Sequence, residues 1–273
     1  MNIALTGATG RIGRVLRAAL LEHGYTLTSS DRAGDPPPPH PRDSYVAGDL
    51  RDRHTVDAVL KGTQALVHLA ATSNEQAFAQ ILENNHHALQ EVYEGARRHG
   101  LRRVVYASSN HAFGLHPVTT KLRLDAPPLA DCFYGLSKIW GESLGRMYWE
   151  KHGIETVALR IGTFMDCPPR NARELSTWIG REDLLQLTLR ALEAPAVGFA
   201  AVWGISANTR AYCDLAEGNA IGYVPTQNAE DYADAVYAQA AATPDPVAER
   251  YQGGRFVTQD YTPENRRPAA TPQ

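Results

Sequence analysis

The chain has 273 residues, of which 43% are hydrophobic and 21% are charged, and its formal net charge is −3. This length can bury the core of one domain, or of one domain with a small lobe. The slightly acidic balance argues against nucleic acid or an anionic membrane as a partner, because both attract basic patches. No apolar run approaches the roughly 20 residues that cross a bilayer, and residues 1–5 are typical of a first strand, not of a signal peptide.

The cysteines are few and odd in number. Cys132, Cys167 and Cys213 show neither the spacing of a metal site nor that of a disulfide framework. We therefore expect free thiols, no bound metal and a cytoplasmic location, where thiols stay reduced.

Short apolar runs alternate with helical patterns along most of the chain. The first run, residues 2–6, ends in a glycine-rich turn, and a helical pattern follows over residues 12–20. Residues 35–41 are rich in proline and predict a stiff surface loop. In chain order, we expect further strands at residues 25–30, 45–47, 65–70, 103–107, 155–161 and 199–203, and helices at residues 55–60, 78–99, 134–152 and 183–193.

This alternation predicts an α/β fold, a Rossmann-type doubly wound parallel sheet with helices on both faces. The pattern loosens after about residue 165. We expect residues 166–265 to form a small substrate-binding lobe that is interleaved with the sheet. Residues 266–273 are polar and proline-rich, which predicts a flexible tail.

A glycine-rich turn joins the first strand to the first helix, with Gly7, Gly10 and Gly13 in the spacing GxxGxxG. The first two glycines let the turn close and the backbone approach a pyrophosphate, and the third lets the helix pack on the strand. The helix start at Arg11 and Ile12 then offers unpaired N–H groups to the phosphates. Ordinary turns also contain glycines, but the position between a strand and a helix favours a dinucleotide site. Residues 1–165 therefore form the expected NAD-binding domain.

Two strand ends after this turn are candidates for binding the adenosine half of the dinucleotide. Asp31 ends the second strand about 20 residues past the glycine turn, where a carboxylate binds the ribose. Its charge would repel a 2′-phosphate, which favours NAD, although Arg32 beside it leaves NADP open. Asp49 and Leu50 end the third strand, where an adenine would lie. For these positions, an ordinary solvated turn is the competing interpretation.

Tyr134 and Lys138 lie four residues apart at the start of a predicted helix, which places both on one face. A phenol is mostly neutral at neutral pH, but a nearby lysine and a nicotinamide cation favour the phenolate, so Tyr134 is a candidate general base. Ser109 follows a strand at the carboxyl edge of the sheet, where open α/β sheets bind ligands, and it can hydrogen-bond the reacting oxygen. Taken alone, the YxxxK spacing arises often by chance, and an exposed pair on a helix would be the simpler interpretation.

With these residues, the chain resembles the extended short-chain dehydrogenase/reductase superfamily, which includes the NAD-dependent epimerases and dehydratases, over about residues 1–225. The resemblance implies that Tyr134 is the base, that Lys138 modifies its pKa and binds the cofactor ribose, and that Ser109 orients the substrate. It implies a structural or proton-relay role for Asn85. The residues that it places along the cofactor include Leu69, Ala70, Ala71 and Ile161.

Five strings resemble the bacterial uronate dehydrogenases more narrowly: Ser-Ser-Asn-His at 108–111, Tyr-Gly-Leu-Ser-Lys at 134–138, Arg-Ile-Gly-Thr at 160–163, Leu-Ser-Thr-Trp at 175–178 and Val-Trp-Gly-Ile-Ser-Ala-Asn at 202–208. This resemblance implies that C1 of a cyclic hexuronic acid, D-galacturonate or D-glucuronate, is oxidised to an aldarolactone with NAD⁺ as hydride acceptor. It implies that Arg173 binds the C6 carboxylate through its planar guanidinium. The other residues implied to contact the sugar acid are Ser73, Ser109, Asn110, His111, Tyr134 and Thr163.

Several alternatives stay open at this point. Arg170 is the alternative to Arg173 for the carboxylate, and His111 is a second choice as the base. Thr163 and residues 166–169 differ from the family, so the preference for galacturonate or glucuronate is open. An NAD-dependent epimerase or reductase of another small substrate is a competing function. A non-catalytic dinucleotide sensor is another, although such proteins usually lack the Tyr and Lys pair. The resemblance to the superfamily also implies a homo-oligomer that pairs through residues 78–99 and 134–152.

Overall fold

The computed structural model describes residues 1–32, 36–239 and 245–262, and in these ranges seven parallel strands form one sheet in the order β3-β2-β1-β4-β5-β6-β7. The expected flexible tail, residues 266–273, lies outside the described residues, as does the first residue of the proline-rich loop. The strands are β1 (Asn2–Thr6), β2 (Thr26–Asp31), β3 (Asp43–Ala47), β4 (Ala65–His68), β5 (Arg103–Ser109), β6 (Glu155–Ile161) and β7 (Phe199–Gly204).

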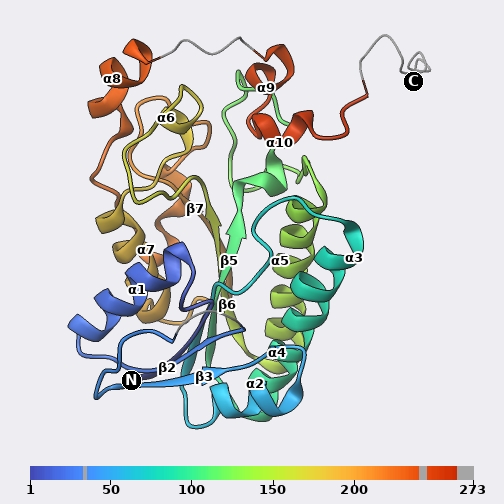
Figure 1. Ribbon diagram of the computed structural model, residues 1–273, viewed down its shortest axis with the longest axis vertical. Helices are drawn as coiled ribbons and strands as arrows, with labels where there is room; N and C mark the ends of the chain where they lie inside the picture. The colour runs from blue at the N-terminus through green and yellow to red at the C-terminus, as the bar shows by residue number, and fades with distance from the viewer. Residues whose placement is uncertain (33–35, 240–244, 263–273) are drawn as a thin grey trace.

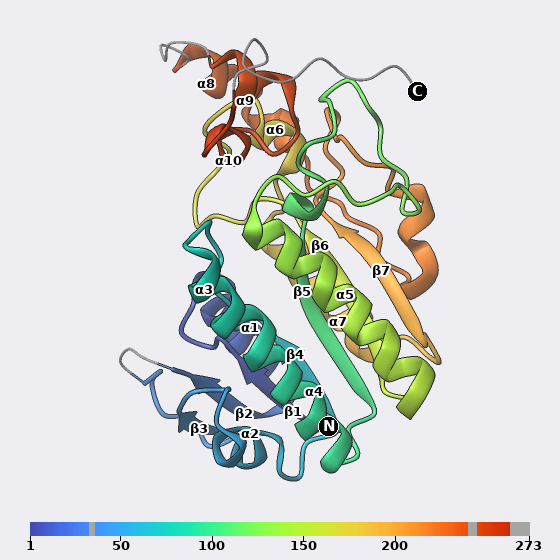
Figure 2. The same cartoon turned by 90° about the vertical axis from the view of Figure 1, so that its right-hand side faces the viewer.

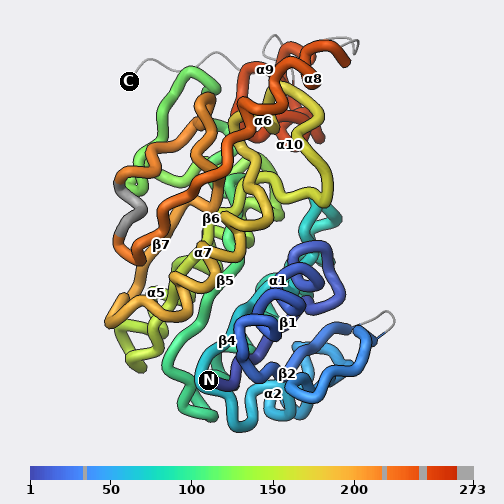
Figure 3. The backbone as a smooth tube through the Cα atoms, turned by 90° about the vertical axis from the view of Figure 1, so that its left-hand side faces the viewer, coloured from blue at the N-terminus to red at the C-terminus, as the bar shows by residue number. Residues whose placement is uncertain are grey.

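Helices cover both faces of the sheet, as a doubly wound fold requires. In Figure 1, α1 and α7 lie on one side of the strands, and α2, α4 and α5 lie on the other. Figure 2 looks onto the layer of α4 and α5, and Figure 3 onto the layer of α1 and α7. The bounds are α1 (Arg11–Glu22), α2 (Arg53–Leu60), α4 (Ala88–Arg98), α5 (Phe133–His152) and α7 (Arg181–Glu193). The predicted Rossmann-type architecture is confirmed.

Each face of the sheet has its own hydrophobic core. Successive side chains of a strand point to opposite faces, so Ile3 and Leu5 pack in the core under α1 and α7, whereas Ala4 packs in the core under α2, α4 and α5. The central strands are covered on both faces, and every residue of β6 is buried. This double burial fixes the edge at which the strands end, and the candidate site lies at that edge.

The long helix expected at residues 78–99 is interrupted. A π-helical turn, η1 (Leu82–His87), separates α3 (Phe78–Ile81) from α4. Asn85 is buried in this turn, where its amide oxygen accepts from the backbone nitrogen of Thr72 at 2.8 Å and its amide nitrogen donates to Ser137 Oγ at 2.9 Å. Such turns concentrate at functional sites. Hydrophobic periodicity did not reveal this one, because the buried positions continue through it.

Most other predicted elements agree with the structure to within a few residues. The strand expected at residues 65–70 ends at His68, because Leu69 and Ala70 already line the cleft described below. The strand expected at residues 103–107 continues to Ser109, where it still pairs with Ile161 of β6.

Short helices gather beyond the carboxyl ends of the strands, at the top of Figure 1. They are α6 (Glu174–Thr177), α8 (Ala233–Ala238), α9 (Pro246–Arg250) and α10 (Arg255–Thr258). The described residues also form the 3₁₀ turns η2 (Asn110–Phe113), η3 (Ala216–Ile221) and η4 (Ala229–Tyr232). β7 and α7 also lie within residues 166–265, but β7 is a strand of the main sheet and α7 is one of the helices that cover it. The division into residues 1–165 and 166–265 stays a prediction. None of the described helices has the length and hydropathy of a membrane-spanning segment.

A buried ion pair joins the starts of β5 and β6 to the end of α7. Arg103 Nη2 lies 2.6 Å from Glu155 Oε2, and Arg103 Nη1 donates to the carbonyls of Ala191 and Leu192. We predict that Arg103→Met lowers the free energy of unfolding by about 3 kcal/mol, because it leaves a buried carboxylate without its main partner. Urea denaturation measures this loss.

Arg102 provides the matched control. It also contacts Glu155, at 3.4 Å, but its side chain is 69% exposed. Arg102→Met should therefore cost less than about 1 kcal/mol. Equal losses for the two variants would contradict the role given to Arg103.

Candidate active site

The glycine turn between β1 and α1 forms a backbone cradle. Gly7 has a φ of +73°, and a Cβ there would lie 2.8 Å from the backbone nitrogen of Ala70. A Cβ on Gly13 would lie 2.0 Å from the Gly7 oxygen, so this glycine lets α1 pack on the turn. Among the described residues, a Cβ on Gly10 would meet only the Gly7 oxygen, and it would fill part of the cleft that Gly10 lines. α1 has no side-chain cap, so its first N–H groups and this cradle fit a dinucleotide pyrophosphate.

Asp31 ties the end of β2 to the same turn. Its Oδ2 accepts from the backbone nitrogen of Thr9 at 3.1 Å and from its hydroxyl at 2.7 Å, and its Oδ1 accepts from the backbone nitrogen of Arg32. A carboxylate has about four acceptor sites, so Asp31 keeps capacity for a ribose hydroxyl. The Arg32 side chain donates to Asn84 Oδ1 at 2.8 Å. These contacts fit the expected preference for NAD, because the carboxylate faces the place of a 2′-phosphate while Arg32 has another partner.

A cleft of about 860 Å³ runs from the glycine turn along the carboxyl ends of β4, β5 and β6. The predicted cofactor residues all line it: Gly7, Gly10, Arg11, Ile12, Gly13, Asp31, Asp49, Leu50, Leu69, Ala70, Ala71, Lys138 and Ile161. So do most of the predicted catalytic and substrate residues: Ser73, Ser109, His111, Tyr134, Thr163 and Arg173. Asn110 is not part of the lining, and its side-chain oxygen lies 3.5 Å from Ser109 Oγ. The fold thus brings nearly the whole predicted set to one cleft.

Tyr134 and Lys138 lie in the first turns of α5 and face the end of β5. Lys138 Nζ donates to the carbonyl of Ala107 at 2.7 Å and lies 5.4 Å from the centre of the Tyr134 ring. Ser109, the last residue of β5, lies beside Tyr134 and acts to lower the pKa of its phenol. All three side chains are buried, at 8%, 4% and 4% exposure for Tyr134, Lys138 and Ser109. A phenol, a hydroxyl and an amine in this arrangement can exchange a proton with an alcohol bound in the cleft.

Two side chains cap the helix that carries Tyr134. Cys132 Sγ accepts from the backbone nitrogen of Gly135 at 3.3 Å. The Glu75 carboxylate accepts from the backbone nitrogens of Phe133 and Tyr134, at 3.1 and 2.9 Å. A negative charge at a helix N-terminus is stabilising. Glu75 belongs to the loop that follows β4, so this cap also links that loop to the helix that carries Tyr134.

Burial has the largest effect on the pKa values of Tyr134 and Lys138. It raises the pKa of Tyr134 to about 12, and the hydrogen bond with Ser109 acts in the opposite direction. Burial also lowers the pKa of Lys138 to about 7. Within the polypeptide itself, Tyr134 therefore keeps its proton at neutral pH, and Lys138 alone does not produce the expected phenolate. A phenolate at Tyr134 therefore requires a further positive charge in the cleft, because a nearby cation lowers the pKa of a phenol.

Asn85 connects the loop after β4 to α5. Its amide nitrogen donates to the carbonyl of Thr72 as well as to Ser137 Oγ. Ser137 in turn donates to the carbonyl of Tyr134 at 2.7 Å. The sequence left a structural role and a proton-relay role open for Asn85. These hydrogen bonds favour the structural role.

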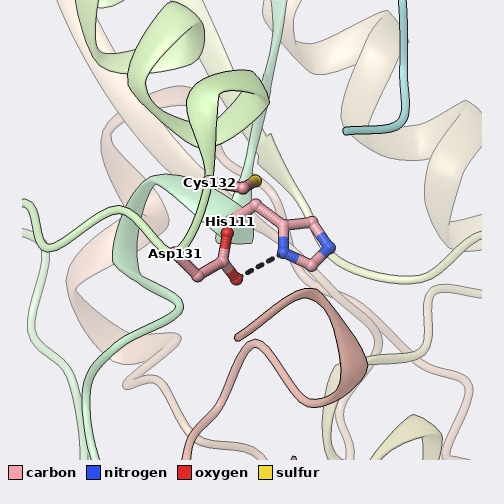
Figure 4. Close-up of side chains that lie close together, drawn as sticks. All are labelled: His111, Asp131 and Cys132. Atoms are coloured by element: carbon pink, nitrogen blue, oxygen red, sulfur yellow. Dashed lines mark hydrogen bonds and ion pairs between the residues drawn. The ribbon is translucent and has the colours of Figure 1, made fainter. Parts of the chain in front are cut away.

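His111 pairs with Asp131, and Cys132 lies beside them (Figure 4). His111 Nδ1 is 2.7 Å from Asp131 Oδ2, and the His111 ring is edge-on to Tyr134 with 6.0 Å between ring centres. The potential metal ligands of the three residues lie within 4.8 Å of one another. Two ligand atoms on one tetrahedral zinc ion would be about 3.3 Å apart. The distance between His111 Nδ1 and Asp131 Oδ2, 2.7 Å, is shorter than this ligand spacing and is typical of a hydrogen bond.

Arg173 immediately precedes α6 and lines the cleft. Its Nε donates to the carbonyl of Gln252 at 2.7 Å, and its Nη1 donates to Thr163 Oγ1 at 3.4 Å. Its Nη2 is buried without a hydrogen-bond partner among the described residues. Arg170 also lines the cleft, but its Nη2 pairs with Glu174 Oε1 at 3.1 Å. Of the two candidate arginines, Arg173 has the buried nitrogen that still needs an acceptor.

Residues 253–256, at the start of α10, also contribute to the cleft. The sequence did not predict this contribution. Phe256 lines it and stacks on His111 with 3.9 Å between ring centres. A Cβ on Gly253 would lie 2.0 Å from Asp131 Oδ2, and one on Gly254 would lie 2.5 Å from a side-chain carbon of Arg173. An aromatic residue just after two glycines in a polar stretch is a signal that could have identified this segment. Glu75 and Asp131 were also missed, and no local pattern marks them.

The comparisons with known proteins agree with this geometry. The model of the NAD dependent epimerase/dehydratase family matches residues 3–197. The chain belongs to this family. It is 39% identical to a uronate dehydrogenase of Pseudomonas putida over 94% of this chain and 95% of that protein.

Solved structures lead to the same relatives. A variant of the uronate dehydrogenase of Agrobacterium tumefaciens, complexed with NAD, is 39% identical with a TM-score of 0.89, over 94% of this chain and 97% of that chain. A glucuronic acid dehydrogenase of Chromohalobacter salexigens is 36% identical with a TM-score of 0.89, over 94% and 96% of the two chains. The protein is thus similar to NAD-dependent enzymes over nearly its full length.

Proposed function

We propose that this protein is an NAD-dependent dehydrogenase that oxidises C1 of a cyclic hexuronic acid, D-galacturonate or D-glucuronate, to an aldarolactone. One observation carries the proposal: Tyr134 and Arg173 line the same cleft, and Arg173 has a buried guanidinium nitrogen without a partner among the described residues. Tyr134 with Ser109 suits an alcohol, and Arg173 suits a carboxylate. A hexuronic acid contains both groups. The similarity to named uronate dehydrogenases supports this substrate class.

The proposed mechanism assigns one task to each side chain. Tyr134 removes the proton of the C1 hydroxyl as the general base. Ser109 hydrogen-bonds the same oxygen and keeps it beside the phenol. Lys138, when protonated, adds a positive charge that favours the phenolate. NAD⁺, held by the glycine turn and Asp31, supplies the hydride acceptor when it is bound.

The carboxylate has a separate site in the proposal. Arg173 offers Nη2, while its Nε and Nη1 are held by Gln252 and Thr163. These two bonds fix the plane of the guanidinium before substrate arrives, so less side-chain entropy is lost on binding. Thr163 is itself held by Thr177, Oγ1 to Oγ1 at 2.9 Å.

The first experiment measures NADH absorbance after the protein is mixed with NAD⁺ and either D-galacturonate or D-glucuronate. We expect NADH to accumulate, because a dehydrogenase releases the reduced cofactor, whereas an epimerase returns the hydride. Tyr134→Phe should lower kcat by a factor of about 10² to 10⁴, the range of general-base catalysis. Tyr237→Phe, at a half-exposed tyrosine away from the cleft, serves as the control. The uronate assignment is wrong if neither acid gives NADH, and the base assignment is wrong if Tyr134→Phe retains full turnover.

A second experiment compares the two arginines. We expect Arg173→Ala to raise the KM for both acids by roughly 30-fold, since a charged hydrogen bond contributes about 2 kcal/mol. The KM for the corresponding uncharged aldose should change much less. Arg170→Ala is the matched variant, and it should leave both values nearly unchanged because Arg170 is paired with Glu174. If Arg173→Ala affects the acid and the aldose equally, the carboxylate role is excluded.

We further propose that the protein forms a homo-oligomer through the outer faces of α3 and α5. Exposed apolar residues lie at helical spacing on α5, where Phe133, Leu136 and Met147 are 45%, 52% and 42% exposed. Phe78 of α3 is 52% exposed and packs on Phe133 with 5.3 Å between ring centres. Neighbouring apolar side chains of this size on a surface favour burial against a second copy.

Light scattering tests the oligomer. The wild-type protein should have at least twice the mass of the chain, and the charged substitution Met147→Glu should shift it to the monomer. Glu150→Gln on the same helix, at an exposed position, is the control. A monomeric wild-type protein would exclude the interface. We also propose a cytoplasmic location, which the free thiols of Cys132, Cys167 and Cys213 support.

A further inference from the structure

The carboxylate of Asp131 is enclosed beside the cleft. Its side chain is 0% exposed, and Oδ1 has no hydrogen-bond partner among the described residues. Gly114 and Gly253 make the space for it, since a Cβ on either would lie within 2.0 Å of Oδ2. The backbone nitrogen of Asp131 donates to the carbonyl of His111 at 3.3 Å. Backbone and side chain therefore both hold Asp131 against His111.

This contact determines which nitrogen of His111 carries a proton. A carboxylate can only accept, so Nδ1, at 2.7 Å from Oδ2, must be the donor. Burial lowers the pKa of His111, although Asp131 acts in the opposite direction, and a lowered pKa favours the neutral ring. A neutral imidazole has one N–H only. Its Nε2 is then a hydrogen-bond acceptor, and Figure 4 shows it on the far side of the ring from Asp131.

The ring itself cannot turn freely. Phe256 stacks on one face of His111, with planes inclined by 28°, and Tyr134 meets the ring edge-on. His111 lines the cleft next to Ser109, so its free edge is available to a ligand that reacts at Tyr134. A hydrogen-bonded partner that sets both the tautomer and the orientation of a histidine is a recurrent device in catalytic sites.

We propose that Asp131 is a positioning residue for substrate recognition: it holds His111 in the Nδ1–H tautomer, so that Nε2 accepts a hydrogen bond from a ring hydroxyl of the sugar acid. This inference rests on the proposed function. It separates the tasks of two side chains in the cleft. An Nε2 acceptor repels the lone pairs of a carboxylate, which leaves that group to Arg173. The same nitrogen discriminates against a ligand that offers an acceptor instead of a hydroxyl at this place.

The tautomer is measured first, without substrate. Two-bond ¹H–¹⁵N correlation spectra distinguish the two neutral tautomers and the imidazolium of a histidine. The chain has 10 histidines, and the signal lost in His111→Gln assigns His111. We expect the Nδ1–H form in the wild-type protein at pH 7. The Nε2–H form or the imidazolium would overturn the proposal, and this result does not depend on whether Asp131 variants fold.

The second measurement links the tautomer to binding. Asp131→Asn keeps the shape of the side chain but can turn its NH₂ group toward Nδ1, which makes Nε2 a donor. We expect the Nδ1–H signal of His111 to fall and the KM for the uronate to rise about tenfold or more, with kcat changed less than about threefold. Asp125→Asn removes a carboxylate from an exposed position six residues away and should change none of these values. An unchanged KM in Asp131→Asn, or a raised KM with an unchanged tautomer, would overturn the proposal.

The two hypotheses fail in different ways. If the wild-type protein forms no NADH with either acid, the proposed function is wrong, whatever the tautomer of His111. If NADH forms and His111 is not in the Nδ1–H form, the role of Asp131 is wrong and the proposed function stands.

Discussion

The parallel register of β4, β5 and β6 carries the carboxyl ends of three central strands to one edge of the sheet. The site depends on this register. Because Ser109 is paired with Ile161 across β5 and β6, the hydroxyl that would hold the substrate and a residue that lines the cofactor cleft have fixed relative positions. α5 then needs only to start at this edge for Tyr134 and Lys138 to face the same space. Caps from Cys132 and Glu75 and the Asn85 amide set that start.

Burial changes the acidity of the charged and polar groups of the site. It makes Lys138 a weaker base and Tyr134 a weaker acid than they are in water. The same low polarity strengthens each hydrogen bond that the polypeptide supplies. Arg173 and His111 follow one pattern: both line the cleft, and one nitrogen of each is held by the protein. A ligand therefore meets donors and acceptors whose orientation is already determined.

The parts of the site that could be predicted from the sequence are those that depend on short stretches of chain. Gly7, Gly10 and Gly13 have a local cause, a turn that must pass close to Ala70 and to α1. Tyr134 and Lys138 share a helix face, and the alternation of strands and helices predicted a doubly wound parallel sheet. The cleft residues therefore gathered much as expected.

The parts that could not be predicted depend on contacts between distant segments. Glu75 meets α5 58 and 59 residues away, and Asp131 meets His111 across 20 residues. Neither contact leaves a periodic pattern. The buried positions Ile81, Asn85 and Leu89 keep the spacing of a normal helix through the π-helical turn, so periodicity cannot reveal it. Asn110 was expected in the lining from the resemblance to the uronate dehydrogenases, but it begins the 3₁₀ turn η2 after β5 and is not part of the lining.

Phe256 lies near the end of the described residues, so the ribosome adds this part of the site after the rest. A ribosome that has synthesised residues 1–250 has produced every strand of the sheet, the glycine turn, Tyr134, Lys138 and Arg173. The aromatic face that holds the His111 ring, and the carbonyl of Gln252 that orients Arg173, are still missing at that stage. A nascent chain can therefore acquire its dinucleotide cradle early, whereas its sugar-acid pocket matures only when one of the last described turns folds back onto the sheet.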